Sequence, residues 1–158
     1  MKTIIKIGLA AAGLVALSTA AVSDSHSGFE KQIKARQSVM QIYSFNIGNL
    51  AAMVKGEAEY DAAKAQEFAD NLLAAAKMKN GAMWPQGSDA EALPGKTRAL
   101  KLNWTSYPEA AKKQEALVAA AEAASKAAGG GMDALKGALG GLGGGCKGCH
   151  EKFRKPKE

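Results

Sequence analysis

The sequence predicts an all-α protein that folds as an antiparallel four-helix bundle. Four segments place apolar residues at alternating steps of three and four, which is the spacing of a helix with one buried face. Strand signals are nearly absent, because the chain is rich in Ala, Lys, Glu and Gln and has few alternating β-branched residues. Short connections join the first two and the last two segments, so each pair is expected to run antiparallel, with one longer crossing between the pairs.

The first two helices are expected over about residues 29–54 and 60–78. Gly56 is a plausible end for the first helix, and Asn80-Gly81 is the stop signal after the second. The predicted buried seam of the first helix consists of Phe29, Ile33, Met40, Tyr43, Ile47, Leu50 and Val54.

The last two helices follow a long connection between Gly81 and Asn103, which is too rich in Pro and Gly to be a tight turn and is expected to wrap over part of the protein. The third helix is expected over about residues 108–128, with Pro108 in its first turn. Gly129-Gly130-Gly131 then breaks the chain. The seam of the fourth helix consists of Met132, Leu135, Leu139, Leu142, Cys146, Cys149 and Phe153, so both cysteines are predicted to face the core.

The N-terminal residues 1–21 have the layout of a secretory signal peptide, because Lys2 and Lys6 precede an apolar run with small residues at its end. An uncleaved anchor is the alternative. It is disfavoured because the run is shorter than the roughly 20 apolar residues of a bilayer span and no positive cluster follows it. We therefore expect a single mature domain of residues 22–158, without a membrane span, in the periplasm.

The charge balance is modestly basic, with 21 Lys and Arg against 15 Asp and Glu, and does not indicate nucleic-acid binding. Much of the excess follows Cys146, in a cluster formed by Lys147, Lys152, Arg154, Lys155 and Lys157. Such a cluster is either a solvated face or a docking surface for an acidic partner, since complementary charge mainly speeds encounter.

The stretch Cys146-Lys147-Gly148-Cys149-His150 is a C-x-x-C-H motif, which is typical of c-type haem attachment. Residues three apart on a helix share a face, so both thiols can bond one edge of a haem while the imidazole of His150 points at the iron. We therefore predict one covalently bound haem c, attached through Cys146 and Cys149. Gly148 and the glycines at 143–145 are expected to let the flat macrocycle approach the backbone.

The sequence supports three other roles of the two cysteines less well than haem attachment. A disulfide would close only a four-residue loop inside a helix, where little loop entropy is at stake. A thioredoxin-like pair requires a strand before the motif and a βαβ setting. A zinc site would need four ligands, and the only other histidine, His26, lies near the start of the mature chain.

Two residues of the first helix stand out on its apolar seam. Arg36 needs a buried partner there, for which a haem propionate is the natural candidate, unless its side chain reaches the edge of the bundle. Met40 lies one turn further on, and without a haem it would be interpreted as a core residue.

These residues resemble the class II c-type cytochromes, which include cytochrome c′ and its c-556 and c-554 relatives. The resemblance covers nearly the whole mature chain and depends on residues 36–40, 55–63, Trp84 and 146–154. It implies a four-helix bundle, commonly dimeric, with haem near one end. It also implies the roles of individual residues: propionate contacts from Arg36 and Gln37, a loop contact from Thr97, the distal site for Met40 opposite His150, and a proximal position for Arg154.

Two functions remain open. The first is one-electron transfer with transient redox partner proteins, which Met40 would favour as sixth iron ligand because thioether ligation stabilises reduced iron. The second is binding of a small neutral gas such as nitric oxide or carbon monoxide at five-coordinate iron, with Met40 as a lid. A structural or sensory haem module is a weaker possibility. No second metal set or pair of catalytic carboxylates is apparent, so the sequence does not indicate an enzyme.

Overall fold

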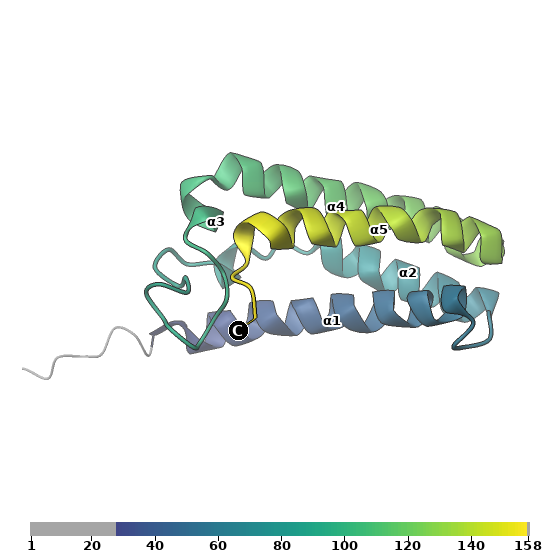
Figure 1. Cartoon of the computed structure of the whole chain (residues 1–158), viewed down its shortest axis with the longest axis horizontal. Coiled ribbons are helices and arrows are strands. Elements are labelled where there is room, and N and C mark those ends of the chain that lie inside the picture. The colour runs from purple at the N-terminus through teal and green to yellow at the C-terminus, as the bar shows by residue number, and fades with distance from the viewer. Residues whose placement is uncertain (1–27, 158) are drawn as a thin grey trace, which may run out of the picture.

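The computed structural model describes residues 28–157, so the signal peptide expected at residues 1–21 lies outside the described residues. Four long helices form an antiparallel bundle (Figure 1): α1 (Glu30–Lys55), α2 (Ala62–Lys77), α4 (Tyr107–Ala127) and α5 (Met132–Phe153). The short α3 (Leu102–Thr105) and the 3-10 turns η2 (Gly81–Met83) and η3 (Ala128–Gly130) lie in the connections. The predicted fold class is confirmed. Within residues 28–157, no helix has the length and hydrophobicity to span a bilayer.

The helix ends follow the local signals. Gly56 adopts φ 75°, the left-handed conformation that glycine tolerates, and its N–H bonds the Met53 carbonyl at the end of α1. The α2 helix begins at Ala62, two residues later than expected, because the Asp61 side chain caps it by accepting from the Lys64 N–H at 3.0 Å. The α4 and α5 helices begin and end within one residue of the predicted positions.

The core combines a few leucines with many alanines. Leu50, Leu72, Leu135 and Leu142 are fully buried, and the small side chains between them let the helices approach closely. The prediction that Met40 lies on this buried seam was wrong: Met40 is 38% exposed, whereas its neighbour Val39 is 4% exposed. Val39 and Tyr43 are four residues apart and share the core-facing stripe, which places Met40 about 100° away around the helix.

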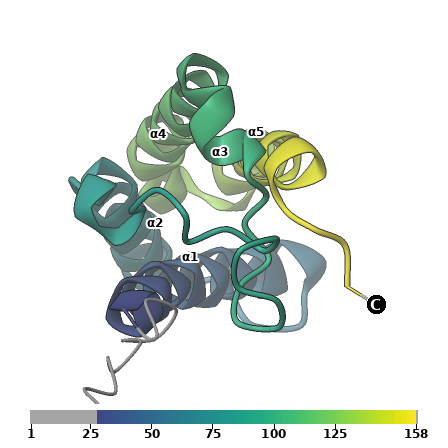
Figure 2. The ribbon, with the colours of Figure 1, turned by 90° about the vertical axis from the view of Figure 1, so that its left-hand side faces the viewer.

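The long connection between α2 and α4 closes one end of the bundle. It crosses that end between the helices (Figure 2) and meets the chain that follows α5. The Leu100 N–H bonds the Phe153 carbonyl at 3.0 Å, and the Lys155 N–H bonds the Arg98 carbonyl at 2.8 Å. We call this pairing of residues 98–100 with residues 153–155 the backbone clasp. It fixes the loop beside the C-terminal end of α5.

Candidate functional site

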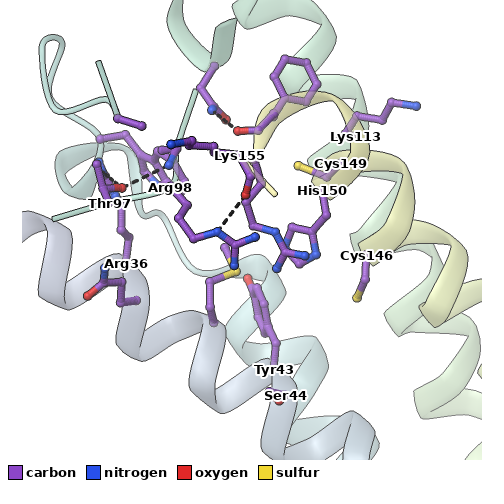
Figure 3. Close-up of a pocket in the computed structure, with 18 of the residues that line it drawn as sticks. Arg36, Tyr43, Ser44, Thr97, Arg98, Lys113, Cys146, Cys149, His150 and Lys155 are labelled. Carbon is purple, nitrogen blue, oxygen red and sulfur yellow. Dashed lines mark hydrogen bonds between the residues drawn. The ribbon is translucent and has the colours of Figure 1, made fainter. Parts of the chain in front are cut away.

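A cavity of about 980 Å³ opens at the end of the bundle that the loop closes. Its walls come from α1, the loop, α4, the last turns of α5 and the segment after α5 (Figure 3). Its volume lies at the upper end of the range of about 300–1,000 Å³ that is usual for ligand pockets. The five residues that carried the sequence prediction, Arg36, Met40, Cys146, Cys149 and His150, all line it.

The last turns of α5 bring Cys146, Cys149 and His150 to one wall of this cavity. Both cysteines are free and half-buried, and Cys146 packs against the core as expected, next to the buried Leu142 and Phe153 of the same helix. Burial raises the pKa of both thiols, and for Cys149 the nearby Lys113 partly opposes this effect.

The imidazole of His150 is also half-buried at this wall. Burial lowers its pKa, and the positive charges of Arg154 and Arg98 lower it further. The neutral imidazole is therefore the favoured form at neutral pH, and it is the form that can coordinate a metal.

The glycines of α5 differ in what surrounds them. A Cβ atom at Gly145 would lie 3.3 Å from the Leu117 Cα of α4, so Gly145 permits close packing of these two helices. Gly143 and Gly144 have open space in the corresponding position. A Cβ at Gly148 would lie 3.5 Å from Lys113 Nζ, and both Lys113 and Leu117 line the cavity.

Arg36 is buried, with 4% exposure, and its hydrogen bonds go to the loop. The guanidinium donates to Ser88 Oγ at 2.7 Å, to the Ser88 carbonyl at 2.5 Å and to Thr97 Oγ1 at 3.0 Å. It also lies 4.7 Å from the ring centre of Trp84 and 5.9 Å from that of Trp104. Burial lowers the pKa of Arg36, and nearby Asp89 opposes this effect. The guanidinium therefore joins α1 to the loop and does not reach the edge of the bundle.

Sequence reasoning missed Ser88 and Trp104 as partners of Arg36. Ser88 follows a Pro/Gly-rich stretch with no periodic pattern, so nothing in the sequence indicated that its carbonyl would turn toward α1. Trp104 lies in the short α3, which the sequence did not predict, and its indole N–H donates to the Trp84 carbonyl at 2.9 Å.

The other two sequence candidates, Gln37 and Thr97, also line the cavity. The Gln37 side chain donates to the Lys96 carbonyl at 3.2 Å, and Thr97 Oγ1 accepts from the Ala99 N–H at 3.2 Å as well as from Arg36. Both residues therefore help to fix the loop segment that forms this side of the cavity.

The cavity wall is strongly cationic. In the part of the chain that the structure describes, no Asp or Glu lines it. Seven basic residues do so: Arg36, Lys96, Arg98, Lys113, Arg154, Lys155 and Lys157. Such a wall favours a ligand that carries carboxylates.

The sequence model of the family described as cytochrome C′ matches residues 31–154, which include all of α1 except its first residue, the loop and the motif on α5. The chain belongs to the cytochrome c′ family. Cytochrome c-554 of Cereibacter sphaeroides is 34% identical over 132 residues, which cover 80% of this chain and 94% of that protein.

Two solved structures of cytochrome c′ are similar to this fold. The structure from Rhodobacter sphaeroides has a TM-score of 0.78 at 34% identity and covers 81% of this chain and 98% of that one. A nitric oxide complex of a variant from Alcaligenes xylosoxidans has a TM-score of 0.69 at 30% identity and covers 81% of this chain and 96% of that one.

Members of the cytochrome c′ family carry one covalently attached haem c with its iron. This chain, as a member, carries one as well. The cavity suits that group in three respects. It offers two thiols on one helix face, a neutral imidazole beside them, and cations without competing carboxylates for the two propionates. Its volume is sufficient for a group of this size.

Proposed function

We propose that this protein is a one-electron carrier that acts in the periplasm. The observation that carries the proposal is that Met40 of α1 and His150 of α5 line the same cavity, so that a thioether and an imidazole are available from two different helices. A haem c bound between them supplies an iron that alternates between the ferric and ferrous states. Fixed ligation by two side chains limits rearrangement between those states, and a thioether ligand raises the reduction potential.

In this proposal each residue of the cavity has one role. Cys146 and Cys149 would hold the haem through thioether bonds, and His150 would bind its iron. Met40 would be a second ligand to the iron, from α1. Arg36 and Thr97 hold the loop against α1, and Gln37 fixes the loop at Lys96, while the cations that line the cavity would pair with the propionates.

Absorption spectra of the ferric protein test the role of Met40. We expect a methionine-to-iron charge-transfer band that disappears in Met40→Ala. The matched control is Met78→Ala, because Met78 is 41% exposed, similar to the 38% of Met40, but does not line the cavity. A high-spin spectrum that Met40→Ala leaves unchanged would rule out ligation by Met40.

A second candidate function is the binding of a small neutral gas at five-coordinate iron. The solved nitric oxide complex of a relative supports it, as does the thioether of Met40, which is flexible enough to act as a lid over the cavity. Carbon monoxide added to the reduced protein distinguishes the two functions. Rapid binding in the wild type favours gas binding, whereas binding that becomes rapid only in Met40→Ala favours electron transfer.

Attachment of the haem and export of the chain are tested separately. Haem bound through Cys146 and Cys149 should resist acid-acetone extraction, and it should become extractable when both are replaced by Ala. Export predicts a mature N-terminus at about residue 21 or 22, which intact-mass measurement of the protein from the periplasmic fraction can detect. A mass that includes residues 1–21 would contradict cleavage.

We also propose that two copies of the chain associate through α1. Phe45 and Ile42 on this helix are 64% and 43% exposed, and Phe45 packs edge-on against Phe68 of α2 with ring centres 5.9 Å apart. Adjacent large apolar side chains on a surface favour contact with another protein surface. The second copy is the occupant that the family resemblance implies.

A further inference from the structure

We propose that the mouth of the cavity docks an acidic electron-transfer protein. The docking surface is a cationic rim that consists of Lys96, Arg98, Lys113, Arg154 and Lys157. The proposal rests on the proposed function, because a carrier must bring its haem edge close to that of a partner. To the proposed function it adds the place where the partner binds and the sign of the partner's charge.

Three separate parts of the chain contribute to the rim. Lys96 and Arg98 belong to the loop, Lys113 to α4, and Arg154 and Lys157 to the segment after α5. The backbone clasp brings the first and the last of these parts together, and Arg98 strengthens it, because its Nε donates to the Lys155 carbonyl at 2.8 Å. The charges are therefore concentrated around one opening by the fold and not by one run of sequence.

Two carboxylates at this end of the bundle, Asp89 and Glu109, are already engaged. Asp89 is buried, and its side chain accepts the N–H groups of Glu91 and Ala92. Glu109 of α4 binds Lys152 at 2.6 Å. The rim therefore keeps most of its charge.

The rim is not the same set of residues as the basic cluster that the sequence suggested, because some lysines of that cluster lie outside the rim and form ion pairs. Lys147 pairs with Glu151 at 3.6 Å, and neither residue belongs to the rim. Within the rim, Lys96 lies 3.7 Å from Glu30, but both side chains are about two-thirds exposed, so this pair screens little of the charge.

The two ends of the bundle differ in charge. The connection between α1 and α2, at the end opposite the cavity, carries Glu57, Glu59 and Asp61, and has no Lys or Arg between residues 56 and 61. Asp133 begins α5 at the same end. At that end Lys64 and Lys136 offset these acids, and Lys55 pairs with Glu57 at 3.8 Å, whereas cations at the cavity end have few carboxylates beside them. An acidic partner is therefore attracted more strongly to the cavity end, which orients the molecule before contact and raises the association rate.

An acidic protein suits the rim better than an anionic membrane does. Proteins that bind at the surface of a bilayer usually insert large apolar side chains between their cations. Among the large apolar side chains that are exposed in residues 28–157, only Met40 lines the cavity. Besides Met40, the exposed uncharged residues that line the cavity are polar or are turn residues without a large apolar side chain: Gln37, Gln41, Ser44, Pro94, Gly95 and Pro156.

The test uses the haem-loaded protein and a reduced plant-type ferredoxin as the acidic probe. The rim variant is Lys96→Glu with Lys157→Glu. The control variant is Lys64→Glu with Lys136→Glu, which changes the net charge equally, at exposed positions near the opposite end of the bundle. Stopped-flow spectroscopy measures the second-order rate constant of electron transfer from the ferredoxin, and chemical-shift perturbation measures binding independently of electron transfer.

At low ionic strength we expect the rim variant to lower the rate constant by about tenfold or more, and the control to change it by less than about twofold. The decrease should vanish at high salt, and binding should weaken in the same order. Equal rate constants in all three proteins, or equal decreases in the two variants, would overturn the docking proposal and leave electron carriage intact. If ferredoxin binds at the rim but no electron transfer occurs, the proposed function is refuted and the docking surface stands.

Vesicles of phosphatidylglycerol test the alternative partner. Co-sedimentation with these vesicles that depends on the rim, together with no binding of ferredoxin, would overturn the proposal in favour of a membrane surface. We expect no more sedimentation of the wild type than of the rim variant at physiological salt.

Discussion

Replacement of Arg36 by Met should destabilise the protein by about 3 kcal/mol. The change keeps a long apolar stem but removes the guanidinium from a site where it is 4% exposed. The Ser88 carbonyl then loses its donor, and a buried acceptor without a partner costs about 1–3 kcal/mol, whereas Thr97 Oγ1 keeps the N–H of Ala99. Loss of the contacts with Trp84 and Trp104 adds about 1–2 kcal/mol to the loss of stability. Part of this loss is offset, because the variant no longer has to desolvate a guanidinium when it folds.

Urea denaturation of the haem-loaded protein, followed by far-ultraviolet circular dichroism, measures this free energy. Lys34→Met is the matched control, because Lys34 is exposed on the same helix and its replacement should change the free energy of unfolding by less than about 0.5 kcal/mol. Hydrogen exchange then locates the effect. The Ala90 N–H, which bonds the Ala99 carbonyl at 2.8 Å within the loop, should lose protection in Arg36→Met. The same urea midpoint and the same Ala90 protection in both variants would refute the reasoning.

Three further predictions concern packing. Gly144→Ala should stabilise the protein by up to about 1 kcal/mol, since a Cβ there has open space. Gly145→Ala should be at least about 1 kcal/mol less stable than Gly144→Ala, because its Cβ would lie 3.3 Å from the α4 backbone. The urea midpoints of the two variants measure this difference. Leu142→Ala should cost about 2–5 kcal/mol in the same assay, and a loss below 1 kcal/mol would show that the core tolerates a cavity there. Phe45→Glu should convert the proposed dimer to a monomer in analytical ultracentrifugation, whereas Tyr107→Glu, at a similarly exposed aromatic residue, should not.

The helices could be predicted from the sequence because their signals are local. Apolar spacing and the signals at Gly56 and residues 129–131 place the ends of the helices to within about two residues. The spacing did not distinguish Met40 from Val39 as the core residue. A strict seven-residue repeat drifts by about 20° per heptad on a straight α-helix, so assignment of neighbouring residues to the core becomes uncertain toward the edge of the buried stripe.

The site was only partly predictable for a different reason. The C-x-x-C-H motif and Met40 identify two walls of the cavity, because each lies on a helix whose position follows from the bundle. The partners of Arg36, and Lys96 and Arg98 of the cationic rim, lie in the connection between α2 and α4, which lacks periodicity and whose path is fixed by hydrogen bonds between residues 47 to 61 positions apart in sequence. No local pattern contains that information.

The backbone clasp affects the order in which the molecule is assembled. It joins residues 98–100 to residues 153–155, so it cannot form until almost the whole chain that the structure describes is available. The pairing is therefore among the last tertiary contacts that the chain can complete during synthesis, and until then the bonds from Arg36 and Gln37 of α1 hold the loop from the other side. Because the pairing consists largely of backbone hydrogen bonds, it depends little on which side chains stand at residues 98–100 and 153–155.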